Sequence, residues 1–397
     1  MARSAASRPS MIWEEAVARR LARHFLLERA APERLVEVAG ALCGVHAQMM
    51  PAAELSIGVR VGGVTARDVG AALWEQRGLV KTYGIRGTLH LFPAHELPLW
   101  MAAARRRNEL EDPRRLADLG LDEAQVAALV AAIAEALHGR RLTLRQLGEA
   151  VVRLAGPWAN EATGSAWSGG WPKWRYALGW AAAAGHLCFG PNEGSQVTFV
   201  HPETWLGISA AEVQAADPQA ALAEVFRRYL RAYGPATARD FAQWFALPPR
   251  VARELATSLG KELQEVDVEG YRALLPASDV DATAPSPRGA VHLLPHFDCY
   301  LRGFHPRERL VGAWAGQAGG GTGTVPVLLL EGAVAGVWER RWERRPQGRH
   351  LAVRVNPFEP LPAAARRRLE LEATRIGEFL ETRVSFSTGS VTVRPHL

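Results

Sequence analysis

Apolar residues recur along the chain in three similar runs, each typical of several helices followed by a two-stranded hairpin. In the first run, we expect Ser10 to cap a helix, and the spacing of Trp13, Val17, Leu21 and Phe25 places them on its apolar face. Three helices and a hairpin are the elements of a winged helix, a module that commonly binds duplex DNA. The run continues with helices that open at Pro32 and at Thr65, and with a hairpin over residues 79–92 that turns near Arg86-Gly87.

The same order of elements returns twice. Because a repeat decides the fold class before any single residue does, we predict three tandem winged-helix units. The second run has helices after Asp122, at Thr143 and over residues 171–185, with a hairpin over 186–200. The third has helices that open at Asp217-Pro218, at Thr237 and after Pro249, with a hairpin that turns at Glu269-Gly270.

The pattern changes beyond residue 277. Strands and hairpins around one helix predict a small β-rich, barrel-like module, so the fold class is α+β. The predicted elements are a hairpin through Glu331-Gly332, a strand over 349–355, a helix from about Ala363 to Glu381, and a last hairpin around Thr388-Gly389. The predicted domains are winged helices over 10–112, 120–205 and 215–277, and the C-terminal module over 288–397.

Composition narrows the functional classes. The chain has 397 residues, 48% of them hydrophobic, and we expect no signal peptide and no membrane contact. Its three cysteines are odd in number and far apart, which argues against a disulfide framework and favours the cytoplasm. Of 47 basic residues only three are lysines, leaving 47 − 3 = 44 arginines. Arginine suits phosphate binding, but a high-GC genome would produce the same excess.

A short polar pair follows the second predicted helix. If the segment Val45-His46-Ala47-Gln48 is extended, His46 and Gln48 point to one side and Ala47 to the other. A histidine accepts a proton near neutral pH, and a glutamine carbonyl can orient a water molecule. Taken alone, such a pair is more often a structural contact than a catalytic one.

Several longer strings in this order resemble the AlkZ/YcaQ-like bacterial DNA glycosylases, also called winged-helix DNA-binding domain proteins. The resemblance extends from about residue 10 to residue 385, which is nearly the whole chain. The strings are GVHAQ with TYGIRGTLHLFPAHEL, then YLRAYGPATARDFAQWFAL, VHLLPHFDCYLRGF and EGAVAGVWERR.

The resemblance implies a C-shaped set of winged helices plus a β-rich module that cradles DNA. It also implies monofunctional excision of alkylated purines, including bulky N7-guanine adducts and interstrand crosslinks, in DNA repair or self-resistance. The family's catalytic motif is usually Gln-Φ-Gln, with Φ apolar, and here it reads His46-Ala47-Gln48. We therefore expect Gln48 to hold the attacking water and His46 to accept its proton or help to orient it.

Further residues are candidates for DNA contact or charge stabilisation. Asp298 could stabilise cationic charge in the cleft, or it could bind backbone amides at a turn after Pro295. The trio His292, His296 and Asp298 lacks usual metal-ligand spacing, so we expect no metal and no cofactor. The predicted DNA contacts are Arg60 on a strand expected over residues 56–61, Lys81, Arg86, Thr88 and His90 in the first hairpin, Lys173, Arg175, Arg302, Arg340 and Arg341.

Two other functions stay open. The first is a non-catalytic winged-helix protein, such as a regulator or a lesion sensor, which would discriminate base sequence. The second is a module that uses winged helices for protein contacts. The prediction we carry forward is a monomeric DNA glycosylase that acts on double-stranded DNA containing alkylated purines.

Overall fold

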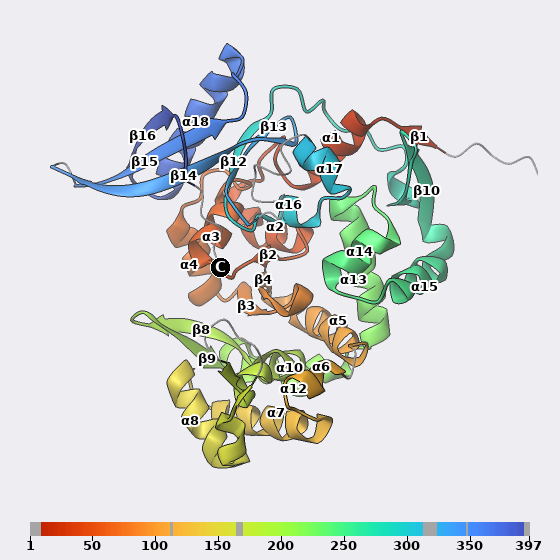
Figure 1. The fold of residues 1–397 in the computed structure, drawn as a ribbon, viewed down its shortest axis with the longest axis vertical. Coiled ribbons are helices and arrows are strands. Elements are labelled where there is room, and N and C mark those ends of the chain that lie inside the picture. Colours follow the sequence, from red (N-terminus) through yellow and green to blue (C-terminus); the bar gives the residue numbers. More distant parts are fainter. Residues whose placement is uncertain (1–8, 112–113, 164–169, 313–323, 347, 393–397) are drawn as a thin grey trace, which may run out of the picture. The chain divides into compact units, whose positions relative to one another are not determined.

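The computed structural model describes residues 9–111, 114–163, 170–312, 324–346 and 348–392. Helices and several separate sheets share the chain, which confirms the α+β class (Figure 1). Within these ranges, no helix combines the length and the apolar character needed to cross a membrane.

The chain forms two compact units. Unit 1 contains Met1–Gly70, Phe226–Trp244 and Pro249–Leu397, and unit 2 contains Ala71–Val225 and Phe245–Pro248. The amino-terminal residues thus belong to the same unit as the C-terminal module. The four domain ranges drawn from the sequence remain predictions.

Unit 1 begins with a strand where we expected a helix cap. Ser10 lies in β1 (Ser10–Met11), which pairs in parallel with β10 (Leu263–Val268), so the prediction that Ser10 caps the first helix is wrong. Helix α1 (Trp13–Arg23) starts three residues later. The pairing buries Met11 and Trp13 in a shared core with β10 and β11 (Tyr271–Pro276). The start of α1 thus depends on the pairing of Ser10 with β10, a strand more than 250 positions away, and the spacing of nearby residues cannot reveal this pairing.

The segment after the His46–Gln48 motif is helical. Helix α2 (Leu35–Ala41) leads to β2 (Val45–His46), and then α3 (Met50–Gly58) begins with Pro51 in its first turn. The arginine-bearing strand predicted over residues 56–61 is therefore wrong, because Ser56, Ile57 and Gly58 end this helix. A short apolar run does not distinguish a buried strand from a buried helix, and here the helix formed.

The third predicted run has the expected elements. Its hairpin β10–β11 turns at Glu269-Gly270, and Glu269 adopts a positive φ of 49°. Tyr229 and Phe241 are fully buried, so the aromatic residues of this run form a core and not a base-stacking surface. Its helices are α13 (Pro218–Tyr233), α14 (Ala238–Phe245) and α15 (Pro249–Leu259).

The C-terminal module is an open five-stranded sheet in the order β12-β13-β14-β15-β16, in place of the expected barrel-like form. The hairpin through Glu331-Gly332 is confirmed, and α18 (Ala363–Phe379) packs against β12, β16 and α3. Of the last predicted hairpin, the first strand is β16, which pairs in parallel with β15; residues 389–392 form no strand, and residues 393–397 lie outside the described part. The strands are β12 (Val291–Leu294), β13 (Val327–Leu330), β14 (Ala333–Arg345), β15 (Gly348–Pro357) and β16 (Arg383–Thr388). Two short helices, α16 (Cys299–Gly303) and α17 (Arg307–Val311), lie between β12 and β13 in the chain.

Unit 2 contains the hairpins of the first two predicted runs. Capping boxes start two of its helices where the sequence indicated, at Asp122 and at Thr143. Its strands are β3 (Leu79–Tyr83), β4 (Leu89–Pro93), β5 (Leu142–Thr143), β6 (Ala162–Thr163), β7 (Trp171–Pro172), β8 (Cys188–Glu193) and β9 (Gln196–Val200). Its helices are α5 (Leu97–Glu109), α6 (Arg114–Asp118), α7 (Glu123–Leu137), α8 (Leu144–Ala155), α9 (Lys173–Tyr176), α10 (Leu178–Ala183), α11 (Pro202–Leu206) and α12 (Ala210–Ala215), and α4 (Ala66–Trp74) spans the boundary between the units.

Candidate active site

The His46–Gln48 motif lies between α2 and α3. Cys43 and Gly44 have positive φ values of 61° and 90°, which turn the chain out of α2 and into β2. Ala47 is fully buried, His46 is 7% exposed and Gln48 is exposed. The carboxamide of Gln48 is therefore accessible to solvent, and the imidazole of His46 lies at the edge of the protein interior.

The ring of Phe297 supports His46. The two rings stack with centroids 4.8 Å apart and planes 27° apart. Phe297 adopts a positive φ of 58° immediately before α16, a conformation that is uncommon for a residue with a bulky side chain. Because the stack restricts rotation of the imidazole, Phe297 fixes the plane in which the His46 nitrogens lie. No spacing or motif in the sequence indicated this contact.

A fully buried ion pair holds the segment that carries Phe297. Arg60 Nη2 lies 2.6 Å from Asp298 Oδ1, and Arg60 Nη1 lies 2.8 Å from Asp298 Oδ2. Ser56 Oγ donates to the same carboxylate at 2.7 Å, and Asp298 Oδ1 accepts from the Tyr300 amide, which caps α16. Burial alone would lower the pKa of Arg60, but Asp298 outweighs it and raises the pKa above its ordinary value. The network joins α3 to the residues beside His46.

This geometry changes two expectations from the sequence. Both side chains of the Arg60–Asp298 pair are 0% exposed, so Arg60 has an internal partner and not the DNA-facing position that we expected. Asp298 binds a backbone amide at a turn, which was the structural alternative for this residue, and its carboxylate is already neutralised by Arg60. Asp298 therefore anchors the segment that carries Phe297, and its carboxylate is buried.

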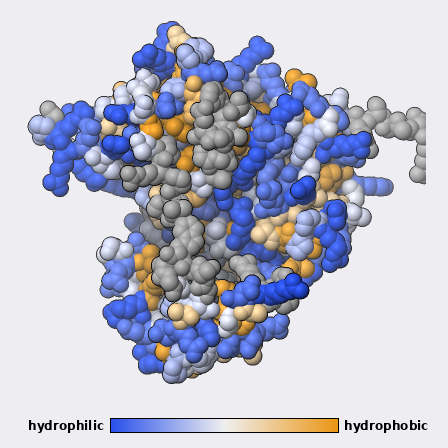
Figure 2. Space-filling model, in the orientation of Figure 1, coloured by the Kyte–Doolittle hydropathy of each residue, from blue (hydrophilic) through white to orange (hydrophobic). Residues whose placement is uncertain are grey.

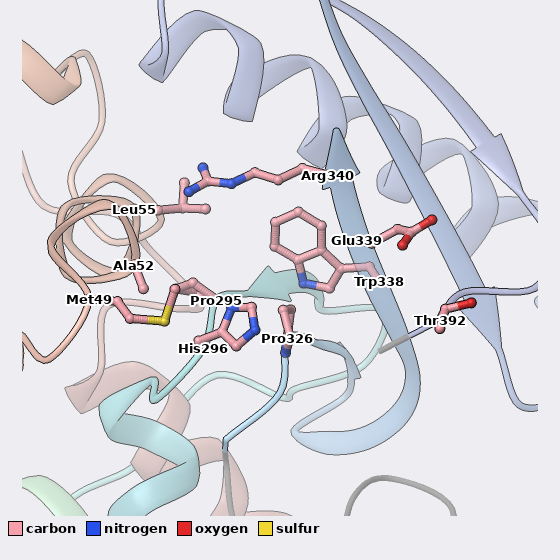
Figure 3. Close-up of a pocket in the computed structure, with 10 residues that line it drawn as sticks. All are labelled: Met49, Ala52, Leu55, Pro295, His296, Pro326, Trp338, Glu339, Arg340 and Thr392. Carbon is pink, nitrogen blue, oxygen red and sulfur yellow. The ribbon is translucent and has the colours of Figure 1, made fainter. Parts of the chain in front are cut away.

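Arg340 reaches from the C-terminal sheet to the start of α3. Its Nη2 donates to the Pro51 carbonyl at 3.3 Å, and burial lowers the pKa of the guanidinium. The side chain borders a cavity that Met49 and Trp338 also line (Figure 3). Arg341, the next residue, is exposed and pairs with Glu339 at 3.2 Å. Of these two predicted DNA contacts, only Arg341 points freely into solvent.

The hairpin β14–β15 extends beyond the packed part of its sheet. Its far end is exposed over the residues described on either side of position 347, and hydrophilic residues cover it (Figure 2). Arg349 lies over the Trp342 ring at 4.3 Å, and Arg345 pairs with Glu343 at 2.7 Å. Arg302, a predicted DNA contact in α16, is half-buried, and burial lowers the pKa of its guanidinium. The arginines at the end of the hairpin are therefore more accessible to solvent than Arg302.

The candidate residues of the β3–β4 hairpin occupy different environments. Lys81 is 7% exposed, and its Nζ lies 5.0 Å from the centroid of the Phe189 ring. His90 is 3% exposed and is the register partner of Thr82, as expected for a cross-strand contact. The side chains at the turn between the strands are more exposed, because Arg86 and Thr88 are both half-buried. Arg86 has a positive φ of 56°, and Thr88 Oγ1 donates a hydrogen bond to the Ile85 carbonyl.

The other two candidates of unit 2 lie around β7 and α9. Lys173 Nζ pairs with Glu161 at 2.7 Å, and the guanidinium of Arg175 lies 4.3 Å from the centroid of the Trp171 ring. Trp171 is 42% exposed, so an arginine and an aromatic ring are presented together on this surface. Among the side chains described, no three of the His, Cys, Asp or Glu residues lie close enough to hold a metal ion.

Comparisons with known proteins identify the family. The sequence pattern of the family described as "DNA glycosylase AlkZ-like" matches residues 39–379, which is well over half of the chain. The chain belongs to the AlkZ-like DNA glycosylase family. It is similar to the "Interstrand DNA cross-link repair glycosylase" of Streptomyces sahachiroi, with 32% identity over 339 residues, which are 82% of this chain and 87% of the relative.

A solved structure agrees with this assignment. The structure of the Streptomyces sahachiroi DNA glycosylase AlkZ is similar to 96% of this chain and all of its own length, with a TM-score of 0.77 and 29% identity. The family match includes the motif, the Arg60–Asp298 pair and the Trp338–Arg341 segment. The chain is therefore a DNA glycosylase, and the resemblance stated from its motifs is confirmed.

Proposed function

We propose that the protein hydrolyses the N-glycosidic bond of alkylated purines in double-stranded DNA, with N7-alkylguanine as the substrate class and with bulky or crosslinked adducts included. Membership in the family supports the reaction, and the relative named for interstrand crosslink repair supports the wider substrate range. The observation that carries the proposal is the exposed Gln48 carboxamide two positions after a His46 imidazole whose plane is fixed by Phe297.

The chemistry requires little acid assistance. An N7-alkylguanine is cationic, so its bond to the sugar is already weakened and the base can leave without a strong proton donor. The enzyme must then stabilise an oxocarbenium-like sugar and deliver water to its anomeric carbon. In this proposal the Gln48 carbonyl accepts a hydrogen bond from the water, and His46 accepts its proton or shares in orienting it.

The lysines favour a monofunctional reaction. A glycosylase that also cleaves the strand commonly forms a Schiff base through an unprotonated amine. Lys81 is almost fully buried, and Lys173 Nζ is engaged by Glu161 at 2.7 Å. Lys261 is exposed in the short turn before β10. We therefore propose that water, and not a lysine, attacks the sugar.

The scaffold fits a DNA-binding role in this proposal. Three winged-helix units in a C-shaped arrangement would cradle the duplex, and the protein would act as a cytoplasmic monomer in base excision repair or self-resistance. The helix-and-hairpin runs and the similarity to a DNA glycosylase structure support this arrangement. A non-catalytic regulator or lesion sensor is the weaker alternative, because the family match is to enzymes.

The decisive experiment measures base release from duplex DNA that contains N7-methylguanine. We expect Gln48→Ala to lower the single-turnover rate by about 100-fold or more, because the water loses its positioning acceptor. Gln48 is exposed, so the variant should fold and retain DNA binding in a gel-retardation assay. Abasic sites are read out by cleavage with alkali or heat, and unchanged release by Gln48→Ala would refute the role.

His46→Gln is the matched variant, because it restores the family's usual Gln-Φ-Gln pattern. We expect it to remain active with an altered preference among N7 adducts. A folded His46→Gln variant that binds DNA but releases no base would instead show that the imidazole is essential.

A further inference from the structure

A cavity of about 250 Å³ lies beside the catalytic motif in unit 1. Its size approaches the roughly 300 Å³ at which pockets begin to take small organic ligands. Apolar side chains form most of its wall, contributed by α3, by the turn after β12, by the start of β13 and by β14. These are Met49, Ala52, Leu55, Pro295, Pro326 and Trp338 (Figure 3).

The cavity lies next to the motif through residues that adjoin it in the chain. Met49 directly follows Gln48 in the chain, and His296 directly precedes Phe297, whose ring stacks on His46. His46 and Gln48 themselves are not among the lining residues, so the cavity borders the proposed site through these chain neighbours.

Arg340 gives the cavity a polar atom without a protein partner. Trp338 and Arg340 are two positions apart on β14, so they project from the same face of the strand toward the cavity (Figure 3). Arg340 Nη2 binds the Pro51 carbonyl, but Nη1 is buried and has no hydrogen-bond partner among the described residues. A buried donor left unsatisfied is costly, and this one points to an acceptor that a ligand supplies.

We propose that this cavity, the adduct pocket, receives the neutral, ring-bearing substituent of a bulky N7-guanine adduct. The ring packs against the indole of Trp338, and an oxygen of the substituent accepts a hydrogen bond from Arg340 Nη1. The inference rests on the proposed function and extends it: the pocket selects adducts by their substituent and not by the purine.

The lining disfavours the purine itself. An alkylated purine is cationic, and the Arg340 guanidinium at the cavity would repel it, although Glu54 offsets part of this charge. Glu339 also borders the cavity, and its carboxylate pairs with Arg341. Pockets that hold an extruded base read its pairing edge through several hydrogen bonds. A mostly apolar wall with the unpartnered donor Arg340 Nη1 suits a neutral aromatic group that carries a carbonyl.

The test compares three duplexes, containing N7-methylguanine, N7-benzylguanine or N7-phenacylguanine, which has a ring and a carbonyl. We expect Ala52→Leu, which fills the pocket, to lower the release rates of the benzyl and phenacyl adducts relative to the methyl adduct by about tenfold or more. Arg340→Met removes the donor and should lower the phenacyl rate relative to the benzyl rate by a similar factor.

The control is Arg341→Met, which removes one arginine from the opposite face of the same strand and should leave all the rate ratios unchanged. Equal losses on all three duplexes, or unchanged ratios in Arg340→Met, would overturn the pocket assignment while the proposed function stands. Should Ala52→Leu fail to fold, Arg340→Met decides alone. If the unsubstituted protein releases none of the three bases, the proposed function itself has failed.

Discussion

At the scale of single residues, the Arg60–Asp298 pair is the feature with the largest consequence. Its atoms are fully buried, and its carboxylate also binds Ser56 and the start of α16. Buried ion pairs contribute little net stability compared with apolar residues, but removing one partner leaves the other as a buried charge without a counterion, which strongly destabilises the fold. The pair holds the residue next to Phe297, so its loss affects the imidazole of His46 as well as the fold.

We expect Asp298→Asn to lower the free energy of unfolding by about 3–5 kcal/mol, because Arg60 keeps a buried charge without a counterion. The double variant Arg60→Met/Asp298→Asn should recover part of the loss, since neither charge remains. Urea denaturation measures both effects. Where Asp298→Asn is folded, its single-turnover base release should fall while DNA binding is retained, as expected of a positioning residue.

The matched control for this prediction is Arg34→Met, which breaks an exposed pair with Glu37. Surface pairs contribute little, so we expect no measurable change in stability. A loss in Asp298→Asn no larger than that of the control would show that the buried pair is unimportant.

At the scale of elements, α18 is tied to the amino-terminal half of unit 1 by one buried carboxylate. Glu372 is 5% exposed and accepts hydrogen bonds from Arg29 Nη2 at 2.9 and 3.1 Å, and it also binds Arg375. His292, in β12, lies 3.7 Å away. Burial alone would raise the pKa of Glu372, but His292 and Arg29 outweigh it and lower the pKa to about 2.

This depressed pKa predicts an acid-sensitive contribution to stability. The contribution is fully present above the unfolded-state value of 4.5 and is lost as the pH falls toward about 2. We expect the contribution of Glu372 to the free energy of unfolding to reach at most about 3 kcal/mol, because its pKa falls from 4.5 to about 2 and each unit of difference corresponds to about 1.36 kcal/mol. Glu372→Gln should therefore be less stable than the unsubstituted protein at pH 7, and the difference should shrink between pH 5 and pH 2. Parallel denaturation curves with a constant difference over this range would contradict it.

At the scale of the whole molecule, charge is concentrated in arginine. The net charge is +6, and the exposed hairpin β14–β15 carries arginines on both strands. Binding to DNA by such a surface releases counterions, so affinity should fall steeply with salt. Salt-sensitive binding that is the same for different base sequences would separate a glycosylase that scans DNA from a regulator that reads base sequence.

We predict that Arg341→Gln weakens binding to undamaged duplexes of different sequence by the same factor. It should also reduce the slope of log affinity against log salt concentration by about 1, because one phosphate contact is lost. The control is Arg366→Gln on the exposed face of α18, which should leave the slope unchanged. Fluorescence anisotropy over a salt series measures both. A change confined to one DNA sequence would instead indicate base reading.

The sequence by itself determined the features that depend on neighbours within a few residues. The capping boxes at Thr143 and Asp122 satisfy amide groups three residues ahead, and the hairpin turn at Glu269-Gly270 places residues with positive φ between two strands. The order of helices and hairpins, and the family to which the motifs belong, therefore follow from local patterns.

The tertiary structure alone decided which distant segments meet. Ser10 joined a strand more than 250 residues away, the expected strand bearing Arg60 became the end of a helix, and Arg60 found its counterion at Asp298. Phe297 came to lie on His46 although neither residue signals the other. The physical reason is that burial and ion pairing depend on the whole packed interior, whereas caps and turns depend on adjacent backbone groups.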